Sequence, residues 1–143
     1  MTLSHPAVRS ACQLDALRRV DPTIRRRHLE LRTWALSQGV AVDRATGDGL
    51  TVVLAVLAEA ESVAELGHQA WSAARVVDFV WHDCPLWCFR QAVAIPAGTT
   101  SALRLLWDHL AATDAFDPGS DERSVLERTL VEHTGAPHGR RRR

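Results

Sequence analysis

A chain of 143 residues without net charge suits a single domain, and the whole molecule has no strong field to attract nucleic acid or a membrane. Its hydrophobic content of 46% excludes an intrinsically disordered protein, because such chains lack the apolar residues that offset the entropy of ordering. No apolar run reaches the ~20 residues of a membrane span, and the N-terminus has no secretory pattern, so we expect a cytoplasmic protein without a membrane partner.

Two helices are predicted at the start of the chain. The first covers residues 6–19 and carries apolar residues at helical spacing on one face, namely Leu3, Ala7, Leu14 and Leu17. Asp21 and Pro22 form an N-cap followed by proline at the first helical position. They predict a second helix over residues 22–37, with Ile24, Leu31 and Ala35 on its core side and His28 nearby.

The next segment, residues 40–49, is rich in turn formers and is interpreted as a loop that ends in the Gly47-Asp48-Gly49 break. Residues 40–42 are the place where a very short strand is possible. A third helix follows over residues 50–60. It is apolar nearly all round, which predicts that it is the central and most buried element.

Ser62-Val63-Ala64-Glu65 matches a capping box, in which serine and glutamate satisfy free backbone N–H groups at a helix start. We therefore expect a fourth helix from Ser62 that ends before Pro85, because the residue before proline avoids the α region. Its apolar stripe would comprise Leu66, Ala70, Ala73, Val77 and Val80, with Trp71 and Trp81 beside it. Residues 86–95 fit either a helical turn or a short strand.

A fifth helix over residues 99–111 has the cleanest amphipathic stripe, and a sixth over residues 121–133 stops at Gly135. The predicted fold class is all-α: a compact bundle of about six helices, with one or two very short strands possible in the loops. The domain would span residues 1–135, followed by a disordered basic tail over residues 136–143.

The densest group of reactive side chains is His82, Cys84 and Cys88. A structural zinc site needs four ligands, so His68 or Cys12 would have to complete this set. The favoured alternative is that both cysteines pack as small apolar residues, because free cysteine is among the most buried residue types. No cofactor is expected.

A Glu-x-x-His pair, Glu65 and His68, would share one face of the fourth helix as in di-iron bundles, but the second pair that such sites require is missing. Neither a nucleophile elbow nor a phosphate-binding glycine loop occurs in the chain. The sequence therefore favours a protein that is not an enzyme.

Charge is segregated along the chain. Residues 1–32 carry +4, residues 33–139 carry −8, and Arg140–Arg143 add +4. Lysine, asparagine and tyrosine are all absent, which we interpret as the base composition of a GC-rich bacterial genome rather than as selection for arginine. Arg25, Arg32 and Arg18 would make one basic face that contacts anions or nucleic acid, and an ordinary solvated face is the alternative.

These observations predict a helical adaptor, subunit or regulatory protein that acts by binding another macromolecule, either a protein partner or a second copy of itself. Five tryptophans exceed the needs of one small core, and Trp34 and Trp87 are candidate interface anchors. One alternative is a nucleic-acid-binding subunit of a nucleoprotein complex. Another is a metal protein that uses His82, Cys84 and Cys88.

Overall fold

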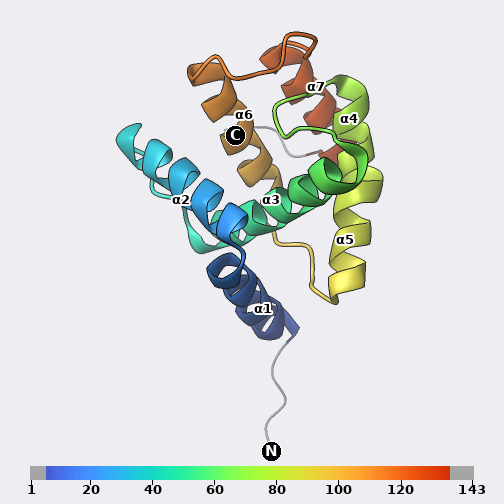
Figure 1. The fold of residues 1–143 in the computed structure, drawn as a ribbon. Helices are drawn as coiled ribbons and strands as arrows, with labels where there is room; N and C mark the ends of the chain where they lie inside the picture. Colours follow the sequence, from blue (N-terminus) through green and yellow to red (C-terminus); the bar gives the residue numbers. More distant parts are fainter. Residues whose placement is uncertain (1–5, 136–143) are drawn as a thin grey trace, which may run out of the picture.

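The computed structural model describes residues 6–135, which fold as an all-α bundle without strands (Figure 1). The elements are α1 (Pro6–Val20), α2 (Pro22–Ser37), α3 (Arg44–Ala64), α4 (Ala73–Asp78), the π-helical turn η1 (Phe79–Asp83), α5 (Cys84–Gln91), α6 (Thr99–Ala112) and α7 (Arg123–Thr134). Since α4, η1 and α5 follow one another without a break, the described chain forms six helical segments, as predicted.

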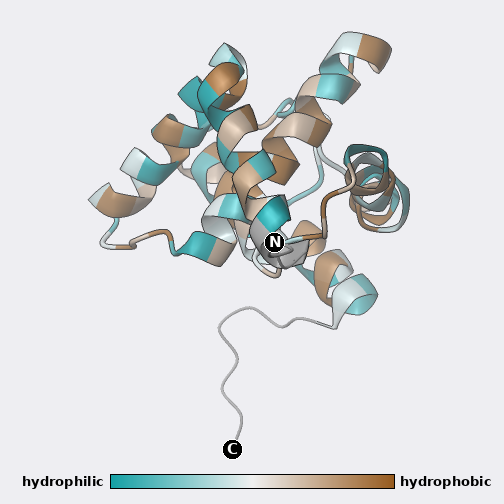
Figure 2. Ribbon diagram, turned by 90° about the horizontal axis from the view of Figure 1, so that it is seen from below, coloured by the Kyte–Doolittle hydropathy of each residue, from teal (hydrophilic) through white to brown (hydrophobic). Residues whose placement is uncertain are grey.

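Helix α3 is the central element of the bundle. Every residue from Leu50 to Leu57 is buried, and α3 contacts α1, α2, α5 and α6. Figure 2 shows apolar and polar residues alternating along the surrounding helices, so that each can place one side against this centre. None of the helices in residues 6–135 combines the length and the apolar character needed to cross a membrane.

The start of α3 corrects the prediction of a glycine break. Asp43 caps the helix by accepting a hydrogen bond from the Thr46 N–H at 2.8 Å, and the helix runs through Gly47 and Gly49. A Cβ on Gly49 would lie 2.5 Å from the carbonyl group of Gly98, just before α6. The glycine therefore permits a close approach of two helices and does not mark a turn.

The N-cap and the buried side of α2 both agree with the prediction. The Asp21 carboxylate accepts hydrogen bonds from the backbone N–H groups of Thr23 and Ile24, both at 3.0 Å. The inward side consists of the four predicted residues, Ile24, His28, Leu31 and Ala35. His28 is 2% exposed, and its Nε2 lies 2.9 Å from the Gly47 carbonyl oxygen, which links α2 to the first turns of α3.

Burial of His28 predicts a loss of stability in mild acid. Desolvation, assisted by the charges of Arg18 and Arg32, lowers the pKa of His28 below 6.5. Below about pH 6.5 the unfolded chain therefore binds a proton at His28, whereas the native state stays unprotonated there until its lower pKa is reached. The free energy of unfolding decreases with falling pH until that native pKa is passed.

The measurement is urea denaturation at about pH 7.5, 6.5 and 5.5, a window above the usual titration of carboxylates. His28→Leu removes the titrating group, while the Gly47 carbonyl still accepts from the Thr51 hydroxyl at 3.2 Å. The variant should match the wild type within about 1 kcal/mol at the highest pH and lose less stability on acidification. Equal losses in both proteins would contradict the assignment.

The second half of the bundle corrects the predicted fourth helix. Ser62 lies in the last turn of α3, and Glu65 is its C-cap in the left-handed conformation, with a φ of 54°. Residues 66–72 form a loop, and α4 begins after Ser72, whose hydroxyl accepts from the Arg75 N–H at 3.1 Å. Pro85 does not end the helix. Proline has no N–H to donate, and the π turn just before it shifts the hydrogen-bond register at the position where that N–H would be needed.

Helices α6 and α7 agree with the sequence prediction. The α6 stripe Leu103, Leu106, Trp107 and Leu110 is buried, whereas Ala111 at its end is exposed. In α7 the buried residues are Leu126, Thr129 and Leu130, and Gly135 is the left-handed C-cap. Residues 40–42 are loop, and residues 86–91 of the ambiguous segment are helix.

Candidate functional site

The outer flank of α2 carries a row of exposed arginines and leucines. Arg25, Leu29, Arg32 and Leu36 follow one another at intervals of four, three and four residues, so they share one side of the helix. All four are exposed, Leu29 to 59% and Leu36 to 68%. This set is called the Arg–Leu stripe below.

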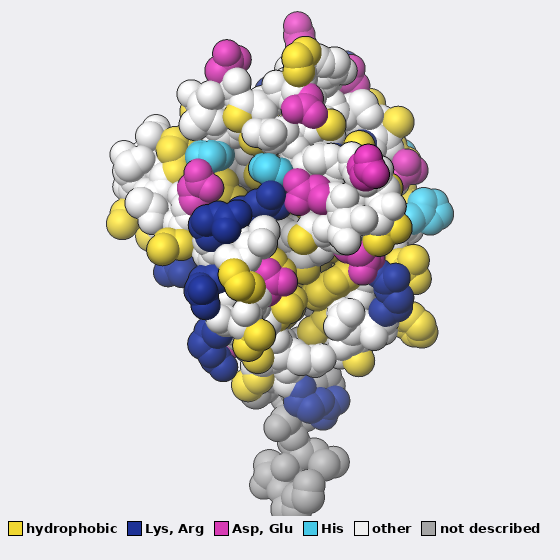
Figure 3. Space-filling model, in the orientation of Figure 1, with side chains coloured by type: hydrophobic (Ala, Val, Ile, Leu, Met, Phe, Trp, Pro, Cys, Tyr) yellow, Lys and Arg dark blue, Asp and Glu magenta, His cyan; other side chains and the backbone are white. Residues whose placement is uncertain are grey.

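Both arginines of the stripe keep their charge available to a partner. Within the described residues, no carboxylate lies within 4.0 Å of Arg25 or Arg32. Arg25 donates to the Arg19 carbonyl oxygen at 2.9 Å, which caps the end of α1 without neutralising the guanidinium. Figure 3 shows arginine side chains along the lower left edge of this face, over α1 and α2, with hydrophobic side chains beside them.

Arg18 does not join this basic face, which corrects the predicted set of three. It is half-buried, forms an ion pair with Asp15 and donates to the Thr51 hydroxyl at 3.5 Å. The Asp15 carboxylate also accepts from Arg44 at 2.9 Å. Arg18 therefore ties α1 to α3, and its charge is compensated inside the protein.

The two predicted tryptophan anchors have different environments. Trp87 is only 6% exposed, because the helix continues through Pro85 and turns this side chain inward; it is therefore not a surface anchor. Trp34 is half-buried on the other flank of α2, edge-on to His109 with ring centroids 5.3 Å apart. The most exposed tryptophan is Trp81, at 58%, whose Nε1 donates to His133 Nδ1 at 3.0 Å.

The structure does not assemble the predicted metal ligands. His82 is exposed, whereas Cys84 and Cys88 are buried on the inner side of α5. Among the described residues no group of three His, Cys, Asp or Glu side chains is placed to hold a metal ion. Cys84 and Cys88 both belong to the buried hydrophobic core, and a hydrogen bond with Cys88, together with burial, raises the pKa of the Cys84 thiol.

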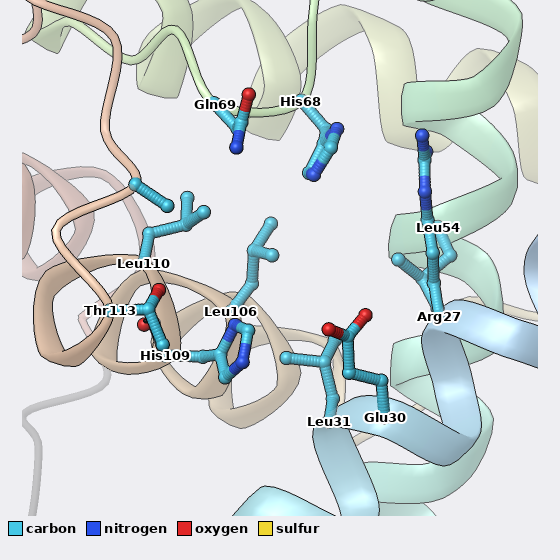
Figure 4. A pocket seen from close by; sticks show the side chains of 11 residues that line it. Arg27, Glu30, Leu31, Leu54, His68, Gln69, Leu106, His109, Leu110 and Thr113 are labelled. Atoms are coloured by element: carbon cyan, nitrogen blue, oxygen red, sulfur yellow. Dashed lines mark hydrogen bonds between the residues drawn. The ribbon is translucent and has the colours of Figure 1, made fainter.

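A second feature is a pocket of about 220 Å³ between α2, α3, α6 and the loop over residues 66–72. Figure 4 shows His68 and Gln69 entering it from the loop, while Glu30 and His109 reach it from α2 and α6. Leucines form its apolar floor. We call it the His68 pocket, and it is lined by Arg27, Glu30, Leu31, Leu54, His68, Gln69, Leu106, His109, Leu110, Thr113 and Ala115.

Glu61 orients two of the groups around this pocket. Its carboxylate accepts from Arg27 at 2.9 and 3.4 Å and lies 3.1 Å from His68 Nδ1. Burial opposes ionisation of Glu61, but the hydrogen bonds from Arg27 and His68 outweigh it and lower the pKa of the carboxyl. An ionised Glu61 accepts a hydrogen bond from the Nδ1–H of His68, and this tautomer leaves Nε2 without a proton.

The partner of His68 differs from the prediction. Glu65 and His68 do not share a helix face, because the helix ends between them and the chain turns back. Sequence reasoning missed the pocket, since its polar residues come from α2, a loop and α6, and no local spacing connects them. The only local signal was a histidine three residues before the buried Trp71, whose Nε1 donates to the His68 carbonyl at 2.8 Å.

Comparison with protein-family models, with curated proteins and with solved structures found no match for this chain. Its function has to be inferred from its own side chains and surfaces.

Proposed function

We propose that this protein is a helical adaptor that binds an acidic, amphipathic helix of a protein partner through the Arg–Leu stripe of α2. The supporting observation is that two arginines without acidic partners among the described residues alternate with two exposed leucines on one helix side. Arginine is enriched at protein interfaces, and apolar side chains between charges gain from being covered. Leucines on a partner helix would cover Leu29 and Leu36, and its carboxylates would face Arg25 and Arg32.

A protein partner fits this surface better than nucleic acid. Phosphate contacts need several accessible cations, and the leucines between these arginines would remain exposed to water beside a sugar–phosphate backbone. The compensation of Arg18 by Asp15 and of Arg27 by Glu61 also reduces the basic area that a duplex would follow. Nucleic-acid binding is the alternative that the experiment below separates.

The test uses fluorescence anisotropy with a labelled helical peptide that carries leucines on one side and glutamates beside them. Binding should weaken roughly 10-fold or more when Leu29 and Leu36 are both changed to alanine, because the apolar area covered by the partner is lost. Changing Arg25 and Arg32 to alanine should weaken it by a few-fold at low salt and reduce its salt dependence.

Matched controls are Leu66→Ala and Arg128→Ala, two exposed residues outside the stripe, which should leave binding unchanged. A peptide with lysine in place of glutamate should bind at least ~10-fold more weakly. The proposal is wrong if the acidic peptide does not bind, or if changing Leu29 and Leu36 to alanine leaves its affinity unchanged. Binding of a DNA duplex of about 20 base pairs with a steep salt dependence and no response to the leucines would favour the nucleic-acid alternative.

A further inference from the structure

The His68 pocket lies on the opposite flank of α2 from the Arg–Leu stripe and combines an apolar floor with polar side chains around it. Its floor is formed by four leucines from three helices, Leu31, Leu54, Leu106 and Leu110. Polar side chains surround this floor and point into the opening (Figure 4). An apolar floor with polar groups that converge on it is a usual feature of a small-molecule site.

The balance of charge around the pocket selects the kind of ligand. Arg27 is the only Lys or Arg side chain lining it, and both of its terminal nitrogens donate to Glu61. Its positive charge is therefore already compensated by an ionised carboxylate. Glu30 has no ion-pair partner within 4.0 Å among the described residues, so the pocket offers one uncompensated negative charge.

His68 adds a directed hydrogen-bond acceptor to this carboxylate. In the tautomer whose Nδ1–H donates to Glu61, the Nε2 of His68 is a hydrogen-bond acceptor. The backbone of His68 is also held in place, since its N–H donates to Glu61 at 3.4 Å and its carbonyl oxygen accepts from Trp71 Nε1. Glu30 and His68 thus both favour a ligand that donates hydrogen bonds.

We propose that the His68 pocket binds a small organic amine, whose apolar body rests on the leucine floor and whose ammonium group donates to Glu30 and His68. Gln69 and His109 complete the polar rim. This binding site goes beyond the adaptor function and does not depend on it, because none of the stripe residues lines the pocket.

The test compares benzylamine, benzyl alcohol and benzoate, which share an aromatic body and differ in charge. Titrations of the full-length protein, followed by NMR chemical shifts at about pH 8, above the usual range of histidine titration, should show benzylamine binding roughly 10-fold or more tightly than benzoate. Benzyl alcohol should fall between them, and the largest shifts should occur in residues 66–72 and at His109.

Glu30→Gln keeps the shape of the side chain and removes its charge, so it should weaken benzylamine binding about 5-fold and leave benzyl alcohol unchanged. Glu132→Gln, at an exposed position of α7, is the matched control and should change nothing. Both glutamates are exposed, so these variants should fold. Benzoate binding as tightly as benzylamine, shifts confined to another surface, or an equal response to the two glutamine variants would overturn the proposal.

Discussion

Replacing Gly98 with alanine should destabilise the protein by about 3 kcal/mol or more, an overpacking cost at the upper end of what cores show. A Cβ at this position would lie 2.3 Å from the carbonyl carbon and oxygen of Ala45 and 2.4 Å from the Thr46 nitrogen. These atoms belong to the backbone of the first turn of α3, so no side chain can rotate to relieve the clash. The two helices would have to separate where the start of α6 meets the first turn of α3.

The conformation of Gly98 makes this a test of packing alone. Its φ of −91° and ψ of 11° are open to alanine, so backbone strain does not contribute. Gly67→Ala is the matched control, because nothing lies within 4 Å of a Cβ at Gly67, and it should be neutral or stabilising by a few tenths of a kcal/mol up to about 1 kcal/mol. Urea denaturation followed by circular dichroism measures both, and equal stabilities for the two variants would refute the close approach of α3 and α6.

Changing Arg75 to methionine should lower the free energy of unfolding by about 3 kcal/mol. Hydrogen bonds of charged groups contribute about 1.5–3 kcal/mol, and breaking them leaves buried polar groups without a partner, which costs further free energy. Arg75 is buried, and its Nη1 donates to the carbonyl oxygens of Gly67 and Ala70, both at 2.6 Å. Its guanidinium also lies 4.5 Å from the ring centroid of Trp71. Methionine keeps the aliphatic length but loses every one of these polar contacts.

The same substitution should loosen the loop that carries His68. Amide hydrogen exchange in residues 66–72 should accelerate more than in α7, because Arg75 ties two carbonyls of that loop to α4. Arg128→Met, at an exposed site on α7, should change neither stability nor exchange. Arg75→Met with native stability and a protected loop would show that Arg75 does not hold this loop.

Several parts of the fold follow from the sequence alone. The cap at Asp21, the apolar spacing of α2 and the stripe of α6 predicted helices with the right bounds and the right buried sides, because these signals act within a few residues of one another. The apolar character of residues 50–57 on every side predicted the central helix for the same reason. Arg25 and Arg32 are exposed and have no acidic partner within 4.0 Å in residues 6–135, and their role as an anion-binding face stays a prediction.

Other features were decided by contacts between distant residues. Gly47 and Gly49 suggest a turn when only their neighbours are considered, yet both lie inside α3. Gly49 has no side chain there because the backbone of Gly98 occupies the space that a Cβ would fill. Ser62-Val63-Ala64-Glu65 read as a helix start, yet a cap contributes only about 1 kcal/mol, less than burial of Trp71 a few residues later.

The His68 pocket depended on tertiary structure altogether. Glu30, His68 and His109 come from segments nearly forty residues apart, and only the packing of α2 and α6 on α3 brings them around one hollow. Local signals identified α2, the centre of α3 and α6 together with their apolar sides, because capping and amphipathic spacing act over a few residues. Long-range packing decided where α3 begins and ends, which arginines are compensated and where the His68 pocket lies, and its energies exceed the local preferences that they override.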